Sequence, residues 1–179
     1  MVVPGGFYNS VDAGGIRMNR LPFGAMRRRE REITDRSEIE AIIKQERIMH
    51  LAFADGGTPF LVPVFYAWDG ASLYVHSARQ GRKVDIMERN PTVCFEISQT
   101  DGVVESEEAC DFEARHRTVI GYASASFVEE ESEKIRALDL IVGRFTDQQF
   151  VYPPAKVAAT AVIRLMVLSL TGKSHGWPV

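Results

Sequence analysis

The residues from His76 to Lys83 are the part of the sequence whose types and spacing could bind a ligand and react with it. They supply an imidazole, the Ser77 hydroxyl and the cations Arg82 and Lys83. A phosphate group prefers charge-assisted donors and a helix N-terminus, and a helix is expected over residues 81–89. Gly81 would let a ligand approach the backbone closely. The segment therefore predicts a phosphate site, although an exposed basic turn would have the same composition.

His76 closes an expected strand over residues 72–77. In an extended chain Val75 and Ser77 face one way, while Tyr74 and His76 face the other. A lone histidine is commonly a structural group, and next to a bound ring it could donate a hydrogen bond or a proton. Both interpretations remain open from the sequence.

Short turns separate most of the apolar segments, which predicts antiparallel strands. Asp55-Gly56-Gly57 and Asp69-Gly70 favour hairpins, and a further turn is expected at 101–102. Helices are expected near Asp35, over 81–89 and from 129–131 onward. Strands are expected at 48–54, 59–68, 72–77, 92–99, 111–127 and 157–171. The fold class is therefore mainly β, a small six-stranded antiparallel barrel with a few short flanking helices.

Two strands have features that suit close contact. Pro63 cannot donate a ladder bond, so its position faces an edge, a bulge or a ligand. The run from Val119 to Phe127 is dense in small residues, which allow another backbone or a flat ligand to come near. Residues 1–26 are glycine-rich and without a period. We expect them to form a flexible N-terminal arm before one domain over residues 27–179.

Composition excludes several classes of function. The 179 residues carry a formal net charge of −3, so no excess of positive charge favours nucleic acid. No apolar run reaches the roughly 18 residues needed to span a bilayer. The N-terminus lacks a secretory signal, so we expect a cytoplasmic protein. Cys94 and Cys110 have no partners at zinc-ligand spacing, so no metal site is expected. Acyl-transfer, Walker and zinc-protease motifs are absent.

Three segments together resemble the pyridoxamine 5'-phosphate oxidase-like flavoprotein superfamily, and within it the nitroimidazole-resistance (Nim-like) branch. They are PFLVPVFYAWDGASLYVHSARQGRKVDIMERNPTVCFEI, RTVIGYASASFVEEESEKIRALDLI and the terminal LTGKSHGW. The resemblance covers roughly residues 27–177. Each piece is a weak signal alone, and their combined order is fairly specific.

The resemblance implies an FMN-binding split β-barrel that forms a homodimer with FMN at the subunit interface. Nine positions match the family's cofactor-binding residues: Val62, Pro63, Val64, Phe65, His76, Ser77, Arg82, Lys83 and Thr118. The strand 62–65 would present backbone to the isoalloxazine ring, and the Arg82–Lys83 pair would hold the flavin phosphate. Thr118 would reach the flavin across the dimer, and His76 would be the catalytic candidate beside it.

FMN suits the residues, because its ring is large and apolar and its phosphate is dianionic. The implied function is an oxidoreductase that passes electrons from NAD(P)H to a small-molecule acceptor, such as a nitroaromatic compound. Two departures bear on the substrate: Phe65 stands where many relatives have Asn, and the Arg-rich C-terminal signature of true pyridoxamine phosphate oxidases is absent. The first leaves the identity of the substrate open, and the second argues against pyridoxamine phosphate as substrate.

Two other functions remain. Split barrels of this kind include haem-utilisation proteins, for which His76, His116 and His175 would be candidate ligands. The chain could also bind a flavin without catalysing a reaction. A deazaflavin could replace FMN in either flavin role.

Overall fold

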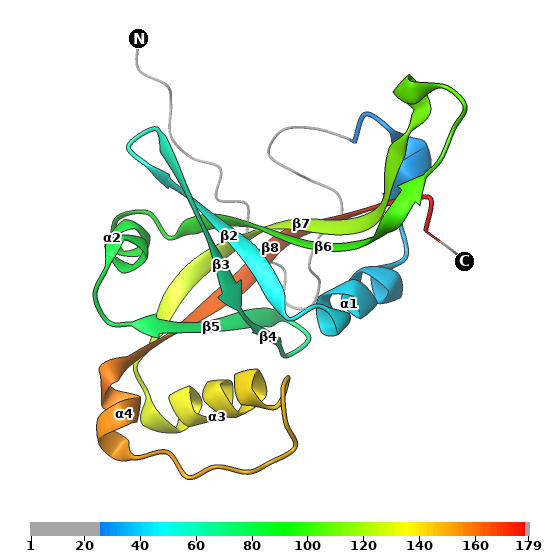
Figure 1. Cartoon of the computed structure of the whole chain (residues 1–179). Helices are drawn as coiled ribbons and strands as arrows, with labels where there is room; N and C mark the ends of the chain where they lie inside the picture. The colour runs from blue at the N-terminus through cyan, green and yellow to red at the C-terminus, as the bar shows by residue number, and fades with distance from the viewer. Residues whose placement is uncertain (1–25, 178–179) are drawn as a thin grey trace.

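Eight antiparallel strands make up one continuous sheet in the computed structural model of this chain, which describes residues 26–177. The expected N-terminal arm lies, apart from Met26, outside the described residues. The strand order is β3-β2-β6-β7-β8-β5-β4, with β1 paired to β8. The sheet curls so that β3 approaches β5 (Figure 1). The mainly β, antiparallel fold class is therefore confirmed. Of the three alternatives for Pro63, an edge, a bulge or a ligand, β3 provides an edge.

The strands are β1 (Glu32–Ile33), β2 (Ile48–Asp55), β3 (Thr58–Phe65), β4 (Ala67–Trp68), β5 (Ser72–Ala78), β6 (Thr92–Val104), β7 (Glu113–Val128) and β8 (Thr160–His175). Two of the eight strands, β1 and β4, have only two residues each. The strand expected over 59–68 is interrupted at Tyr66, whose hydroxyl donates to the Ile43 carbonyl at 2.7 Å. This bond fixes the chain where β3 ends and β4 begins.

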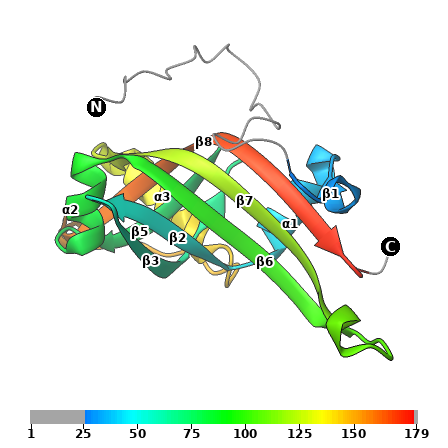
Figure 2. The same cartoon turned by 90° about the horizontal axis from the view of Figure 1, so that it is seen from above.

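The turn expected at Asp101-Gly102 is wrong. Strand β6 continues to Val104, and its pairing with β7 shifts register between Thr100 and Val103. Gly102 has φ of 76°, a conformation that serves a bulge as well as a turn. The hairpin reverses farther on, at a 3₁₀ turn over Ala109–Asp111, and its tip projects beyond the sheet (Figure 2).

Four α-helices flank the sheet: α1 (Arg36–Gln45), α2 (Arg82–Arg89), α3 (Glu131–Val142) and α4 (Pro154–Ala159). Asp35 caps α1 by accepting from the Ser37 amide at 2.8 Å, as its position before the helix predicts. Helix α4 corrects the strand expected over 157–171, which starts only at Thr160. Pro154 favours that helix because its fixed φ suits the first turn. Helices α3 and α4 lie together, and α2 is remote from α1 (Figure 1).

Alternate side chains of the sheet enter two buried clusters. The larger includes α1, α2 and the inner faces of β2, β6, β7 and β8, and the smaller lies under α3. Gly121 is required in the larger one, because a Cβ there would lie 2.3 Å from the Phe95 ring. Among the described helices, none is long and apolar enough to cross a bilayer.

Helix α3 covers the opposite face of the sheet only near Val128 and Val162. The rest of that face, on β3, β2, β6, β7 and β8, has no described helix over it, and we call it the open face. These strands lie side by side in Figure 2. Six large apolar side chains on it are 41–56% exposed: Ile48, Leu61, Phe65, Ile120, Met166 and Leu168. An exposed apolar surface of this extent on one face of a sheet is typical of a binding site for another protein or a ligand.

Candidate functional site

The loop between β5 and α2 sets up an anion-binding geometry. Gly81 precedes the helix with φ of 130°, a conformation that residues with a side chain rarely adopt. Its carbonyl accepts from the Val84 amide at 2.8 Å and starts the first turn. The N–H groups of Arg82 and Lys83 fall in that turn, where a helix offers them no carbonyl. A negative ligand group would be stabilised there by amides, helix dipole and side-chain charge.

Arg82 is directed towards β2 and β3. Its Nε lies 3.7 Å from Asp55 Oδ2, and its guanidinium carbon lies 4.6 Å from the centre of the Phe60 ring. Arg89, at the far end of α2, contacts the same carboxylate at 2.9 Å. Asp55 therefore neutralises part of the Arg82 charge, and Lys83 is the more available of the two cations.

His76 and Ser77 face opposite sides of β5, as alternation predicts. Ser77 is half-buried, and its hydroxyl donates to the Ala78 carbonyl at 2.6 Å. His76 stays partly accessible to water, yet burial by the surrounding protein lowers its pKa, and the Lys83 ammonium lowers it further. Both effects favour the neutral ring. Because the charge of Lys83 affects the pKa of His76, the two side chains belong to one local site.

Strand β3 offers an open edge beside this loop. Val62 and Val64 pack towards the core, while Pro63 and Phe65 face outward. An edge strand has one row of backbone N–H and C=O groups free for a ligand. Arg82 contacts Phe60 near one end of β3, and Phe65 closes the strand about 16 Å farther along. A long ligand with a charged tail could span this length.

Phe65 has partners that the sequence did not reveal. Its ring meets Phe145 edge-on, with centroids 4.9 Å apart, and Arg47 lies 5.4 Å from the centre of the Phe145 ring. Phe145 follows α3 in the chain, so no local spacing connects it to β3. Together they form an exposed aromatic wall at the end of the strand.

Thr118 does not join the other predicted residues within one chain. Its partner on β8 is Lys173, whereas Ser77 of β5 pairs with Ala161 of that same strand, about 40 Å away along β8. The structure therefore brings Ser77, His76, Arg82 and Lys83 together beside β3 and leaves Thr118 on the open face.

A connected row of polar side chains crosses the open face, and no local sequence pattern predicted it. We call it the polar row; it comprises His50, Glu96, Ser98, Thr118 and His116. His50 Nδ1 lies 2.9 Å from Glu96 Oε2, and the Ser98 hydroxyl donates to Glu96 Oε1. Ser98 Oγ lies 2.9 Å from Thr118 Oγ1, which His116 Nδ1 approaches at 3.3 Å.

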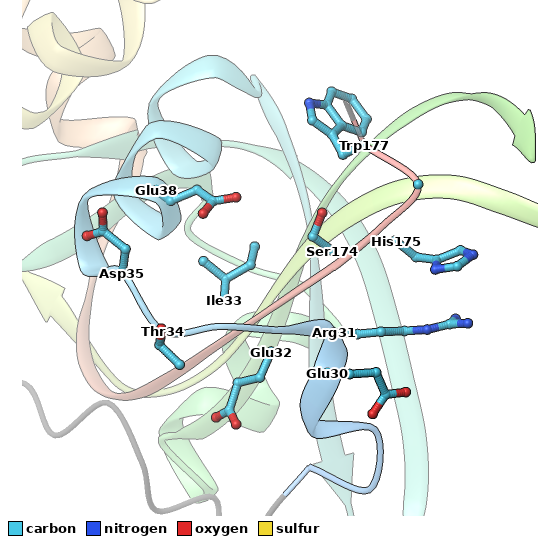
Figure 3. A pocket seen from close by; sticks show the side chains of 11 residues that line it. Glu30, Arg31, Glu32, Ile33, Thr34, Asp35, Glu38, Ser174, His175 and Trp177 are labelled. Atoms are coloured by element: carbon cyan, nitrogen blue, oxygen red, sulfur yellow. The ribbon is translucent and has the colours of Figure 1, made fainter. Parts of the chain in front are cut away.

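Two open clefts are lined by described residues. Neither contains a predicted flavin-site residue, but the larger includes His175, a candidate haem ligand. The larger, about 530 Å³, lies between the start of α1 and the C-terminal segment (Figure 3). Arg31 and His175 lie side by side at its edge, and both contact the Glu113 carboxylate. Its lining carboxylates are Glu30, Glu32, Asp35 and Glu38. Such a lining disfavours a phosphate. The smaller cleft, about 380 Å³, lies between Trp68 and α3.

Comparison with known proteins gives one family. The family model described as pyridoxamine 5'-phosphate oxidase matches residues 35–174. An uncharacterised protein of Rhizobium meliloti (strain 1021) is 31% identical over 67 residues, which are 37% of this chain and 44% of that protein. The match thus spans less than half the length of that relative.

Solved structures share the fold. A protein of Bacteroides thetaiotaomicron with a proposed role in 5-nitroimidazole antibiotic resistance has 30% identity and a TM-score of 0.71, covering 79% of this chain and 85% of that one. A flavocytochrome of Azotobacter vinelandii has 22% identity and a TM-score of 0.81, covering 90% and 78%. An FAD- and haem-binding protein of Mycobacterium smegmatis has 19% identity and a TM-score of 0.75, covering 83% and 76%.

Proposed function

Because this chain belongs to the pyridoxamine 5'-phosphate oxidase family, whose model matches residues 35–174, we propose that it binds FMN. We propose further that it passes electrons from NAD(P)H to a small acceptor. The observation that carries the proposal is the first turn of α2, where Lys83 and two free amides meet the end of β5 beside the open edge of β3. A flat apolar ring and an anionic tail would both find complementary groups there.

The residues fit such a cofactor part by part. The first turn of α2 would hold the phosphate through Lys83, Arg82 and backbone amides. Strand β3 would lie along the ring, with Pro63 and Phe65 directed outward. When bound, the flavin would supply the hydride chemistry. The chain would bind and orient it, exclude water with Phe65 and Phe145, and present neutral His76 near the phosphate loop.

We propose that the protein is a homodimer joined through the open face. Its six exposed apolar side chains would be buried against a second copy of the chain. Apolar surfaces of this size commonly form protein–protein interfaces. Thr118 lies on this face and far from Lys83 in its own chain, so it could serve the flavin site only from a partner. The flavin would then lie at the interface.

The acceptor in this proposal is a small nitroaromatic compound. The exposed wall of Phe65 and Phe145 suits a flat ring. Support comes also from the relative with a proposed role in 5-nitroimidazole resistance, which is 30% identical.

An absorption spectrum of the purified protein tests the cofactor. Absorption near ~450 nm is expected, with FMN identified by mass after release. A deazaflavin would be recognised by its mass in the same experiment. Protein that is colourless and takes up no added FMN would overturn the proposal.

Haem is the second candidate, because His116 and His175 are cross-strand partners on β7 and β8. His76 pairs instead with Val162, about 40 Å of strand away from His175, so the three histidines cannot share one metal. A Soret band near ~400 nm would favour haem over a flavin.

His76 provides a separate prediction. The variant His76→Ala should retain FMN and lose at least about tenfold in turnover, because a positioned acid or base commonly contributes more than that. In ring NMR titrations of the apoprotein, the pKa of His76 should lie below its ordinary value, since burial and then Lys83 disfavour the cation. Lys83→Ala should raise that pKa. Gln80→Ala, in the exposed loop nearby, serves as control, and unchanged turnover in His76→Ala would assign the ring a structural role.

A further inference from the structure

The polar row fixes the direction of its hydrogen bonds. As a carboxylate, Glu96 can only accept. The single hydroxyl proton of Ser98 goes to Glu96 Oε1, so Ser98 Oγ can meet Thr118 only as an acceptor. The single proton of Thr118 must therefore point at Ser98, 2.9 Å away. Thr118 is left with lone pairs alone for any other partner.

The position of the Thr118 proton also determines which ring nitrogen of His116 carries a hydrogen. Its Nδ1 lies 3.3 Å from Thr118 Oγ1, and Thr118 has no proton left to give, so Nδ1 must carry the hydrogen. Burial lowers the pKa of His116, and the charges of Lys173, His175 and Arg31 lower it further. These effects favour the neutral ring, in which Nε2 is an acceptor when Nδ1 carries the hydrogen. The carboxylate of Glu96 on β6 thus sets the tautomer of His116 on the neighbouring strand β7.

The ligand edge that complements Thr118 follows from this polarity. Thr118 presents an acceptor, and its cross-strand partner on β8 is Lys173, a donor. An imide edge, with an N–H flanked by carbonyl oxygens, matches such a pair. The oxidised isoalloxazine ring carries a single N–H, the imide N3–H, so only this group of the ring could donate to Thr118.

We propose that Glu96, acting through Ser98, holds Thr118 as a pure acceptor for the flavin imide N–H of a second copy of this chain. This inference rests on the proposed flavin site and its shared interface. Glu96 and Ser98 are positioning residues, while Thr118 touches the cofactor.

Ring NMR of the apoprotein tests the relay without any flavin. His116 is expected as the Nδ1–H tautomer in the unmodified protein, because the row forces it. In Glu96→Gln the amide can donate to Ser98, and in Ser98→Ala the relay is cut, so both should give a mixed or reversed tautomer. Ser124→Ala, on the same face of β7, should leave it unchanged. An Nε2–H tautomer in the unmodified protein would overturn the inference.

Binding of FMN and of 3-methyl-FMN, which lacks the imide N–H, tests the contact. The unmodified protein should prefer FMN by about tenfold, the worth of one buried hydrogen bond. Thr118→Val and Glu96→Gln should bind FMN about tenfold more weakly and lose most of the preference, whereas Ser124→Ala should retain both. Equal binding of the two flavins by the unmodified protein would refute this contact and leave the flavin site standing. Failure to bind FMN at all would refute both.

Discussion

Replacing Lys83 with alanine is expected to weaken FMN binding by at least about tenfold. Lys83 stands in the first turn of α2, where two backbone N–H groups and the helix dipole also favour an anion. A charge-assisted bond to a phosphate is worth roughly 1.5–3 kcal/mol, and about 1.4 kcal/mol corresponds to tenfold in Kd. Fluorescence titration of the apoprotein with FMN measures the change.

Arg82→Ala should have the smaller effect of the two, because Asp55 already pairs with Arg82. The double variant should lose more than either single one. Riboflavin, which lacks the phosphate, should bind the unmodified protein and Lys83→Ala with similar affinity. Arg89→Ala is the matched control, since it removes a cation from the far end of the same helix. An unchanged FMN Kd in the double variant would show that the phosphate binds elsewhere.

Local patterns predicted those parts of the site that are close in sequence. The alternation of residues 72–77 placed His76 and Ser77 on opposite faces, and the Gly81 break placed Lys83 at a helix start. Pro63 indicated an edge, a bulge or a ligand, and β3 is an edge strand. Each of these features depends on the backbone conformation of a short segment. It can therefore be predicted from residues that are close together in the sequence.

Features that depend on strand register could not be predicted from the sequence. The polar row joins β2, β6 and β7, and its residues are adjacent only because His50 pairs with Glu96 and Ser98 with Thr118. A shift of one residue in either pairing would turn these side chains to the other face. Phe145 meets Phe65 for a similar reason, through packing of the segment after α3. The Asp101-Gly102 error arose because glycine at positive φ serves a bulge and a turn equally.

Placing a charge on the open face is expected to abolish both the dimer and flavin binding. Leu168 and Ile120 are 42% and 41% exposed on β8 and β7, and each would occur twice in a symmetric interface. Burying a leucine or isoleucine is worth roughly 1.5–3 kcal/mol, so one aspartate costs roughly 3–6 kcal/mol per dimer. Leu168→Asp and Ile120→Asp should therefore weaken dimerisation by about 10²–10⁴-fold in analytical ultracentrifugation.

The flavin loss should follow from the same substitutions, although neither residue is proposed to touch the phosphate. If Thr118 serves the flavin only from a partner, a monomer holds an incomplete site, and its FMN affinity should fall in step with the fraction of dimer. Leu140→Asp is the matched control: Leu140 is 37% exposed, but it lies on α3 and lines the smaller cleft with Trp68. A monomeric Leu168→Asp variant that binds FMN normally would place the whole site within one chain, and a variant that stays dimeric would move the interface to another surface.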